Sequence, residues 1–296
     1  MILGFVAYLL WGAFPLYFAF LDSVSPIEIV AHRVIWSLVF IALVLTVARE
    51  WNSIRKAANP RTIRLLTFAA LFLSVNWLVY VYAISVDEVV QASLGYFMNP
   101  LISVALGVIV LKERMRRGQW VAIGIAVIAV VILTINYGGI PWIALILGFS
   151  FGLYGLLKKQ AGVASLPSLM IETVALFLPA LIILTVGEFS GEAAFVVDGW
   201  WISVLLVLLG PVTALPLLAF GGAANRIPLS TLGVIQYTTP IMQFLLGVFV
   251  FGEVMTTGLW IGFILVWIAL VIFTVDELRH AKNNSRLEGL EVADPT

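Results

Sequence analysis

Ten apolar runs of helical length follow one another along the sequence and constrain the fold more than any other feature. Charged or Gly/Pro-rich breaks separate them, and they lie at 2–20, 27–48, 64–86, 88–111, 118–135, 140–158, 166–187, 199–224, 228–251 and 257–276. A bilayer core about 30 Å thick needs about 20 apolar residues per helix. Because unpaired backbone groups are intolerable in hydrocarbon, the runs predict an all-α polytopic bundle rather than a barrel of short alternating strands.

Composition agrees with a chain whose solvent is lipid. The 296 residues are 62% hydrophobic and 11% charged, with a mean hydropathy of +1.11, which would coat a soluble globule in apolar surface. The connections are short, so no soluble domain is expected between the runs. The first run lacks a small-residue cleavage site and contains Trp11 and Pro15, which favours a retained helix over a signal peptide.

Missing residue types exclude several classes of chemistry. Cysteine is absent and two histidines alone cannot build a metal cluster, so neither a metal centre nor a disulfide framework is expected. The sequence has no phosphate-binding loop, no zinc-protease motif and no Ser/His/Asp set, so we expect no ATP hydrolysis, no cofactor and no enzymatic activity. The net charge is zero without a basic surface domain, which argues against nucleic acid as a partner.

Basic residues predict the orientation in the membrane. All sixteen except Arg33 fall in alternate connections or the tail, at 49–64, 112–117, 158–159, Arg226 and 279–286, whereas the opposite connections carry acidic residues such as Asp22, Asp87 and Glu188. Cytoplasmic connections are the ones enriched in Lys and Arg. We therefore expect a cytoplasmic (inner) membrane protein with an even number of spans and both termini in the cytoplasm.

An internal repeat recurs at an offset of 140 residues. Its clearest stretch compares 106–120 with 246–260, and the shared residues include the pairs Gly107/Gly247, Glu113/Glu253, Met115/Met255, Gly118/Gly258 and Trp120/Trp260. Each half holds five runs, an odd number, so the second half must enter the membrane the opposite way round. The predicted domains are a first five-helix repeat at 1–136, a second, inverted repeat at 137–278 and a cytoplasmic polar tail at 279–296.

These segments resemble a known group of membrane proteins. Six segments carry the resemblance: YLLWGAFPLYF (8–18), EIVAHRVIWS (28–37), ASLGYFMNPL (92–101), residues 106–120, MIETVALFLP (170–179) and STLGVIQYTTP (230–240). They are similar to EamA-type proteins of the drug/metabolite transporter superfamily, and within it to the RarD-like branch. The resemblance covers nearly the whole chain. It implies a ten-helix permease of the cytoplasmic membrane that is linked by name to chloramphenicol sensitivity, and it leaves the physiological substrate open.

Arg33 is the only basic residue placed well inside a predicted span, about 10 Å from its outer boundary at 1.5 Å per residue. Burying a guanidinium in a membrane is costly, so it marks an anion site for a substrate carboxylate or phosphate, a structural pair with Glu28, Asp87 or Glu88, or a side chain that snorkels outward. His32 beside it can exchange protons near neutral pH or serve as a packing residue.

Glu172 is the only carboxylate well inside a span, and the repeat offset aligns it with His32. Its expected place in the inner third of the membrane separates it from Arg33 by about 10 Å or more, which argues against a direct ion pair between them. Glu172 is a candidate for proton coupling, as is His32, or for binding a substrate amine. The alternative is a carboxyl group that only hydrogen-bonds neighbouring helices.

Polar and aromatic side chains at helical spacing predict the wall of a central cavity. Asn76 and Tyr80 share one helix face with Trp77 beside them, and Gln236, Pro240 and Gln243 share another at i, i+4 and i+7. The 140-residue offset aligns Tyr96 with Gln236 and Pro100 with Pro240 in the two repeats. The predicted substrate-binding set is Arg33, His32, Trp36, Asn76, Trp77, Tyr80, Tyr96, Asn99, Gln236 and Gln243. The alternative explanation is that Asn99 repairs a proline kink and that the aromatic residues are core packing.

The sequence favours a secondary transporter that moves small metabolites or drugs by alternating access through a cavity between the repeats. Its expected partners are a small molecule of anionic or aromatic character, the lipid bilayer and, as a candidate, protons. An amino-acid or other carboxylate-bearing metabolite facilitator or exchanger stays open as an alternative. A sensor or lipid-processing enzyme is a further alternative that would need a signalling domain or catalytic cluster.

Overall fold

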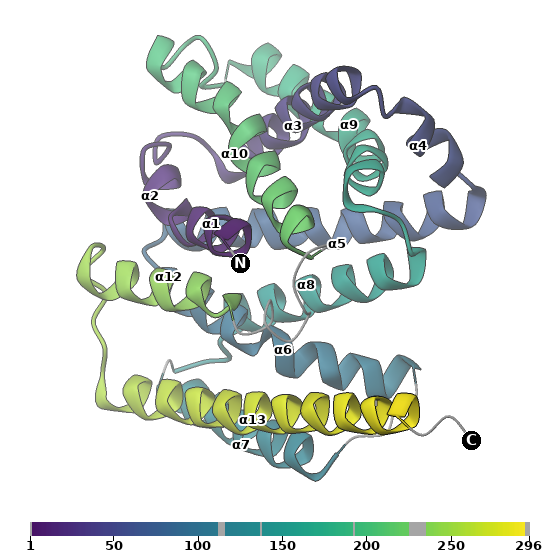
Figure 1. Cartoon of the computed structure of the whole chain (residues 1–296). Helices are drawn as coiled ribbons and strands as arrows, with labels where there is room; N and C mark the ends of the chain where they lie inside the picture. Colours follow the sequence, from purple (N-terminus) through teal and green to yellow (C-terminus); the bar gives the residue numbers. More distant parts are fainter. Residues whose placement is uncertain (1, 112–115, 137, 192, 225–234, 294–296) are drawn as a thin grey trace.

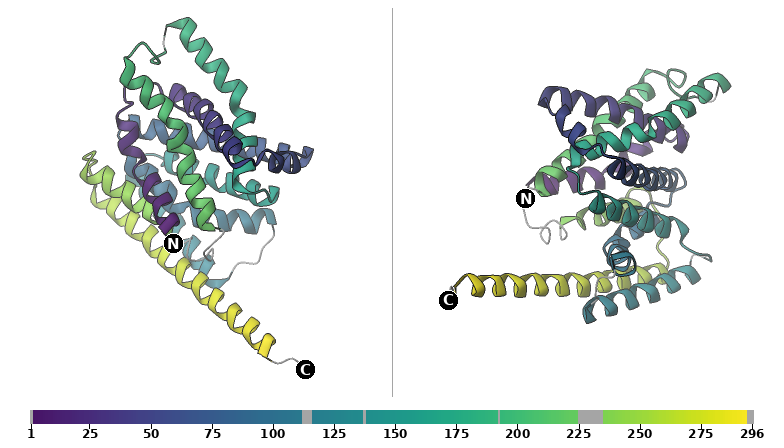
Figure 2. Two further views of the ribbon diagram at one scale, coloured as in Figure 1. Left: turned by 45° about the horizontal axis from the view of Figure 1, so that its top comes forward. Right: turned by 90° about the vertical axis from the view of Figure 1, so that its right-hand side faces the viewer.

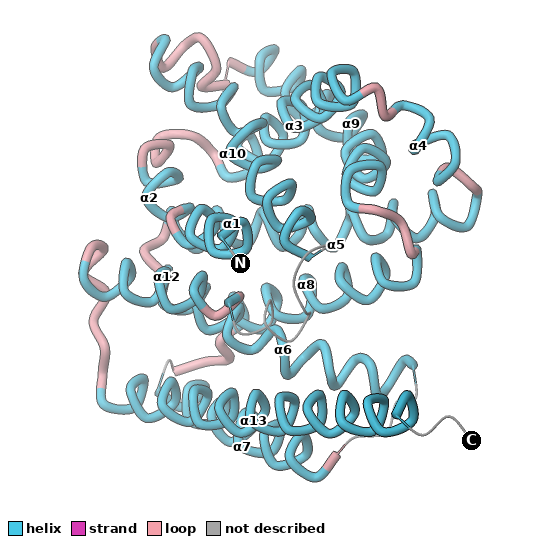
Figure 3. The backbone as a smooth tube through the Cα atoms, in the orientation of Figure 1, coloured by secondary structure: helices cyan, strands magenta, loops and turns pink. Residues whose placement is uncertain are grey.

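The computed structural model describes residues 2–111, 116–136, 138–191, 193–224 and 235–293, and the regular elements in these ranges are helices (Figures 1 and 3). They are α1 Ile2–Gly12, α2 Phe14–Ala19, α3 Pro26–Ala48, α4 Trp51–Ala57, α5 Pro60–Ser85, α6 Val89–Leu111, α7 Arg117–Asn136, α8 Trp142–Ala161, α9 Ser165–Ser190, α10 Trp200–Ala224, α12 Thr238–Phe249 and α13 Thr257–Ala293. Lys112, Glu113, Arg114, Met115 and Arg226 lie outside the described residues.

Eight helical segments in this part of the chain are long and apolar enough to cross a membrane, counting α1 and α2 as one. They are Ile2–Ala19, Pro26–Ala48, Pro60–Ser85, Arg117–Asn136, Trp142–Ala161, Ser165–Ser190, Trp200–Phe220 and Thr257–Asp276. The helix α6 has 23 residues with Pro100 inside it, and α12 is a shorter apolar helix of 12 residues. The protein is therefore an all-helical, multi-pass membrane protein.

Local sequence signals explain where the two helices that carry much of the site begin. In α3, Pro26 occupies the first turn, where its missing N–H is not needed, and Ser25 Oγ accepts a hydrogen bond from the Glu28 N–H at 3.2 Å. In α5, Pro60 has the same place and Asn59 Oδ1 accepts from the Thr62 N–H at 2.9 Å. Consequently α3 starts one residue, and α5 four residues, before the apolar run that predicts it.

Other helices depart from the expected runs for local reasons. The first run is divided at Ala13, two residues before Pro15, and the connection at 49–64 contains the short helix α4. Of the run at 228–251, residues 235–251 are described, and α12 begins at Thr238 so that Pro240 falls in its first turn, where proline is tolerated. The helix α13 continues to Ala293, which makes the predicted polar tail helical and carries it beyond the bundle (Figure 2).

Eight of the helices pack in a closed ring. The helices of the ring are, in order of contact, α3, α10, α1, α12, α6, α8, α5 and α9, and α9 in turn contacts α3. The pair α7 and α13 lies outside the ring against α6, at the opposite edge of the molecule from α3 and α9 (Figure 1). Each contact around the ring joins a helix that precedes residue 137 to one that follows it, so the two halves of the chain alternate around a common interior.

Candidate substrate site

A buried cation lies on the ring at Arg33 of α3, whose residue is 4% exposed. Its Nε donates to Thr213 Oγ1 of α10 at 2.8 Å. The guanidinium carbon lies 4.0 Å from the centroid of the Trp77 ring of α5, and the rings of Phe14 and Phe18 in α2 lie at 5.3 and 5.9 Å. Aromatic faces stabilise a desolvated cation without neutralising it.

Within the described part of the chain, Arg33 has no carboxylate within 4.0 Å, and Thr213 is its one hydrogen-bond partner. The structural pairs with Glu28, Asp87 or Glu88 that the sequence allowed are therefore not formed. Its two terminal amino groups keep their donors for another group. A guanidinium offers planar, paired donors that match a carboxylate or phosphate, so this environment suits an anionic ligand.

Tyrosine and amide side chains from α5, α6 and α12 form a network beside this cation. Tyr80 of α5 and Tyr96 of α6 lie close enough to Arg33 to interact with it electrostatically, and their rings are 5.5 Å apart. Tyr96 donates its hydroxyl to Asn76 Oδ1 at 3.2 Å, and Asn76 Nδ2 donates to the Leu147 carbonyl of α8 at 2.9 Å. The predicted residues Arg33, Asn76, Trp77, Tyr80 and Tyr96 thus come together inside the ring.

Gln243 of α12 completes this network. Its Nε2 donates to the Tyr80 hydroxyl at 2.8 Å and to the Trp11 carbonyl at 3.2 Å, whereas its buried Oε1 has no hydrogen-bond partner among the described residues. Asn99 Oδ1, one turn after Tyr96 on α6, is a second buried acceptor without a partner in that part of the chain. Unpaired buried acceptors are costly, so both oxygens are suited to a ligand that donates hydrogen bonds.

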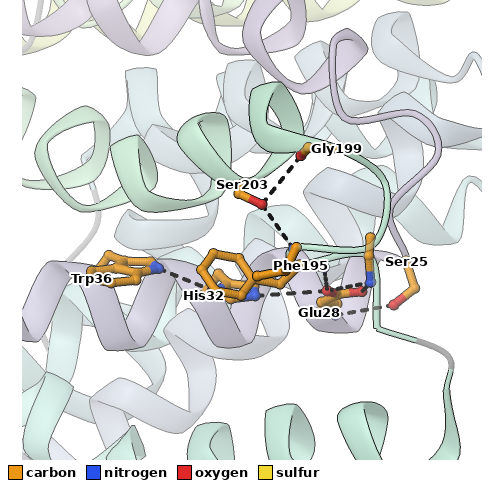
Figure 4. Close-up of polar contacts among 9 residues, drawn as sticks. Ser25, Glu28, His32, Trp36, Phe195, Gly199 and Ser203 are labelled. Carbon is orange, nitrogen blue, oxygen red and sulfur yellow. Dashed lines mark hydrogen bonds and ion pairs between the residues drawn. The ribbon is translucent and has the colours of Figure 1, made fainter.

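His32 and Trp36 lie in a row with Glu28 along α3, beside Phe195 (Figure 4). Trp36 Nε1 donates to His32 Nδ1 at 3.2 Å, and the imidazole ring lies against Phe195 with ring centroids 4.8 Å apart. His32 Nε2 is 3.8 Å from Glu28 Oε1, too far for a hydrogen bond. Because Trp36 donates to Nδ1, the neutral imidazole carries its proton on Nε2, directed toward Glu28.

These residues line a cavity of about 510 Å³ between α3 and α9, separate from the set around Arg33. Glu28 also lines it and joins α3 to the connection after α9, because its Oε1 accepts from the N–H groups of Ala194 and Phe195 at 2.9 and 3.2 Å. The predicted binding set is therefore divided between the ring interior and the cavity between α3 and α9.

Glu172 of α9 belongs to a third polar cluster and is 1% exposed. Its Oε1 accepts from Ser168 Oγ at 2.6 Å and lies 3.1 Å from Lys158 Nζ of α8, and its Oε2 accepts from the Tyr154 hydroxyl at 3.2 Å. Lys158 also donates to the Tyr154 hydroxyl at 2.9 Å. Glu172 does not pair with Arg33, as expected from its depth, but it has a counter-ion that the sequence analysis did not anticipate.

Two site details differ from the prediction. Gln236 is half-buried in a turn before α12, so it does not share a helix face with Gln243. Thr213 and the rings of Phe14 and Phe18 were missed, although Thr213 is a polar residue in an apolar run, two positions after Pro211. A polar residue within a span indicates a hydrogen-bonding contact with a neighbouring helix, because polar side chains in spans usually have a partner, so Thr213 could have been selected from the sequence.

Comparisons with known proteins agree with the sequence resemblance. The model of the EamA-like transporter family matches residues 1–135 and again 139–275. A protein named RarD from Streptomyces exfoliatus is 50% identical over 295 residues, which cover 99% of this chain and 93% of that protein. The RarD protein of Escherichia coli is 37% identical over 286 residues, with 96% and 97% covered.

An uncharacterized transporter of Vibrio cholerae is 42% identical over 288 residues, covering 96% of this chain and 95% of its own. A crystal structure at 18% sequence identity superposes with a TM-score of 0.58 over 93% of this chain and 96% of that one, which shows a shared fold. With the family model matched twice and relatives of this similarity, the chain belongs to the EamA-like transporter family as a RarD-like member.

Proposed function

We propose that this protein is a secondary transporter of small organic molecules that carry a carboxylate or another planar anion, with the binding site at Arg33. The observation that carries the proposal is the environment of Arg33: a buried guanidinium between Thr213 and Trp77, without a carboxylate partner in the described chain. Keeping an unpaired charge away from water is unfavourable unless a ligand of opposite charge uses it.

The rest of the wall indicates what such a ligand carries besides its anionic group. Trp77, Tyr80 and Tyr96 offer aromatic surface, and the unpartnered oxygens of Gln243 and Asn99 accept hydrogen bonds. A zwitterion such as an amino acid, or an aromatic acid with a hydroxyl or amine, satisfies all three features at once. A neutral amphipathic drug would use the aromatic surface and leave Arg33 unpaired, so it is the second candidate.

The packing of the helices supports transport by alternating access between two inverted five-helix repeats. If the first and sixth spans correspond, and so on in order, exchanging the halves converts α3·α10 into α9·α5, α1·α10 into α8·α5, and α1·α12 into α8·α6. The contacts α3·α9, α6·α12 and α7·α13 map onto themselves. This symmetry, together with the double match of the family model, favours the ten-span topology, and the distribution of Lys and Arg favours cytoplasmic termini.

Proton coupling is the second part of the proposal, with Glu172 and His32 as candidate carriers. Lys158 lies at the end of α8 and is partly exposed, so its withdrawal from Glu172 would leave a carboxylate able to take up a proton. His32 Nε2, directed at Glu28 across 3.8 Å, is the alternative carrier.

Transport by the purified protein in proteoliposomes tests the proposal. Vesicles are loaded with a mixture of amino acids, aromatic acids, organic phosphates and a neutral aromatic amphiphile, and release is followed for each compound with and without a pH gradient. We expect release of one or more carboxylates that Arg33→Ala reduces at least tenfold. Release of the neutral amphiphile alone, unaffected by Arg33→Ala, would overturn the anionic assignment and favour the second candidate.

A further inference from the structure

A carboxylate joins the two halves of the chain at one end of the ring. Glu253, in the connection between α12 and α13, accepts from the backbone N–H of Val90 through Oε2 and Oε1, at 3.0 and 3.1 Å. Val90 lies in the first turn of α6, where unpaired N–H groups and the helix dipole favour a negative charge. The bond therefore holds the connection after α12 against the start of α6.

The surrounding backbone makes this a close contact. Glycine at 252 adopts a φ of +71°, and the Glu253 N–H donates to the Gly247 carbonyl at 3.0 Å, which folds the connection back onto the end of α12. A Cβ atom on Gly247 would lie 2.7 Å from Val90 Cγ2 and 3.0 Å from Glu253 Oε1. The ends of α12 and α6 therefore meet without room for a side chain between them.

Negative charge accumulates beside this contact. Asp87 and Glu88, in the connection before α6, line a cavity of about 370 Å³ together with Glu253, and none of its described lining residues is basic. Gln91 Nε2 donates to Glu88 Oε2 at 3.1 Å. On the α13 side the lining residue is Leu259, which is uncharged. Asp87 and Glu88 are thus the titratable groups that face Glu253.

Burial raises the pKa of Glu253 from 4.5 to about 7, the repulsion of Glu88 and Asp87 adds to the increase, and the hydrogen bonds from Val90 and Val89 oppose it. Burial likewise raises the pKa of Glu88, which the bond from Gln91 partly offsets. A solvated Glu253 would titrate near its ordinary value. The closed contact therefore binds a proton more tightly than an open one.

We infer that Glu253 is a gating residue, which holds the α6–α12 contact closed at this end, takes up a proton when the contact closes and releases it when the contact opens. The orientation prediction places this end on the extracytoplasmic side, so external pH would set how readily the transporter opens outward. The inference rests on the proposed function, because only a transporter with alternating access needs this contact to open.

The linkage between proton binding by Glu253 and closure of the contact determines the direction in which pH shifts the opening. The state with the higher pKa is favoured as protons become abundant, so low pH stabilises the closed contact and high pH favours opening. With a closed pKa of about 7 and an open pKa near 4.5, the ratio of open to closed protein rises about 40-fold from pH 5 to pH 7 and only about twofold more by pH 8.

Cysteine labelling can measure this opening without any substrate, because the native chain contains no cysteine. Val90→Cys places a thiol at a residue that is 2% exposed and covered by Gly247 and the Glu253 connection. Its reaction rate with a membrane-impermeant maleimide is measured in proteoliposomes between pH 5 and pH 8. Thiolate formation also varies with pH, so each rate is divided by that of Ser190→Cys, an exposed position predicted on the same side.

We expect the normalised rate to rise about 40-fold between pH 5 and pH 7. In the Glu253→Gln background, the rate should depend on pH no more than that of Ser190→Cys. Glu88→Gln leaves Glu253 in place but removes one repelling charge, so it should move the midpoint of the profile to lower pH. Glu253→Asp keeps a carboxylate with a shorter reach and should retain a pH dependence, which covers the case that Glu253→Gln fails to fold.

A normalised rate independent of pH in the native background would overturn the inference, as would a profile that Glu253→Gln and Glu88→Gln both leave unchanged. Either result leaves the substrate assay and its Arg33→Ala control intact, since labelling requires no transport. Conversely, a pH-dependent opening in a protein that releases none of the test compounds would retain the gate and reject the proposed substrate class.

Discussion

The Lys158 ammonium lies 3.1 Å from Glu172 Oε1, so the carboxylate that sequence reasoning selected for proton coupling has its own counter-ion. The two residues come from α8 and α9, neighbouring elements in the chain, and Tyr154 contacts both of them. Coupling by Glu172 would therefore require Lys158 to move, which provides a way to separate coupling from a structural role.

We expect Glu172→Gln to abolish accumulation driven by a pH gradient while leaving substrate exchange measurable, because glutamine resembles the protonated carboxyl group but cannot release a proton. Removing one partner of a buried pair should also cost about 3 kcal/mol of stability. The double variant Lys158→Met, Glu172→Gln should recover thermal stability without recovering accumulation. Recovery of both would assign Glu172 a structural role, and His32→Gln would then become the informative variant.

Arg33→Lys should impair transport nearly as much as Arg33→Ala, if the guanidinium binds a planar anion through two hydrogen bonds. Initial rates in proteoliposomes measure this, with protein abundance as the control. An ammonium also loses the stacked contact with Trp77, at 4.0 Å. Nearly normal transport by Arg33→Lys would mean that the residue only balances charge.

Thr213→Val removes the hydroxyl that accepts from Arg33 Nε and keeps the shape of the side chain. We expect a loss of about 1.5 to 3 kcal/mol of stability, the usual value for a hydrogen bond to a charged group, and an increased KM as the guanidinium loses its orientation. Thr213→Ser retains the hydroxyl and should behave like the native protein. A change in stability with an unaltered KM would separate Thr213 from substrate binding.

The topology predicts that Ser53 faces the cytoplasm and Ser190 the outside, because Lys and Arg concentrate in the connections on the first side. In intact cells, an impermeant maleimide should label Ser190→Cys, and Ser53→Cys should react only after the membrane is permeabilised. The reverse pattern would invert the orientation and place the Glu253 gate on the cytoplasmic side.

The helical architecture was predictable because the length of an apolar run is a local property. The same holds for Arg33, which stands out as the one basic residue well inside a span. The residues that give Arg33 its environment were less accessible: Thr213 is 180 positions away in the chain, and no periodicity indicates which helices become neighbours. Pairings between distant helices follow from packing, which the sequence pattern does not specify.

The same distinction explains the other differences. His32 and Arg33 are adjacent in sequence, yet about 100° separates successive residues around a helix, so His32 lines the cavity between α3 and α9 whereas Arg33 contacts Thr213 and Trp77. The contact between Glu253 and Val90 joins positions 163 apart and was not predicted, although the repeat had already identified Glu253 through its match to Glu113. Glu113 lies outside the described residues.

The alternation of the two halves around the ring has a consequence for biosynthesis. Each contact that closes the ring needs one helix from each half, so the helices before residue 137 can form none of these contacts until the later ones are made. At about 5 to 20 residues per second, translating the roughly 140 residues of the second half takes about 7 to 30 seconds. Translating the 180 residues that separate Arg33 from Thr213 takes about 9 to 36 seconds at this rate, and during that time Arg33 lies in the membrane without its hydrogen-bond partner, accessible to insertion factors and proteases.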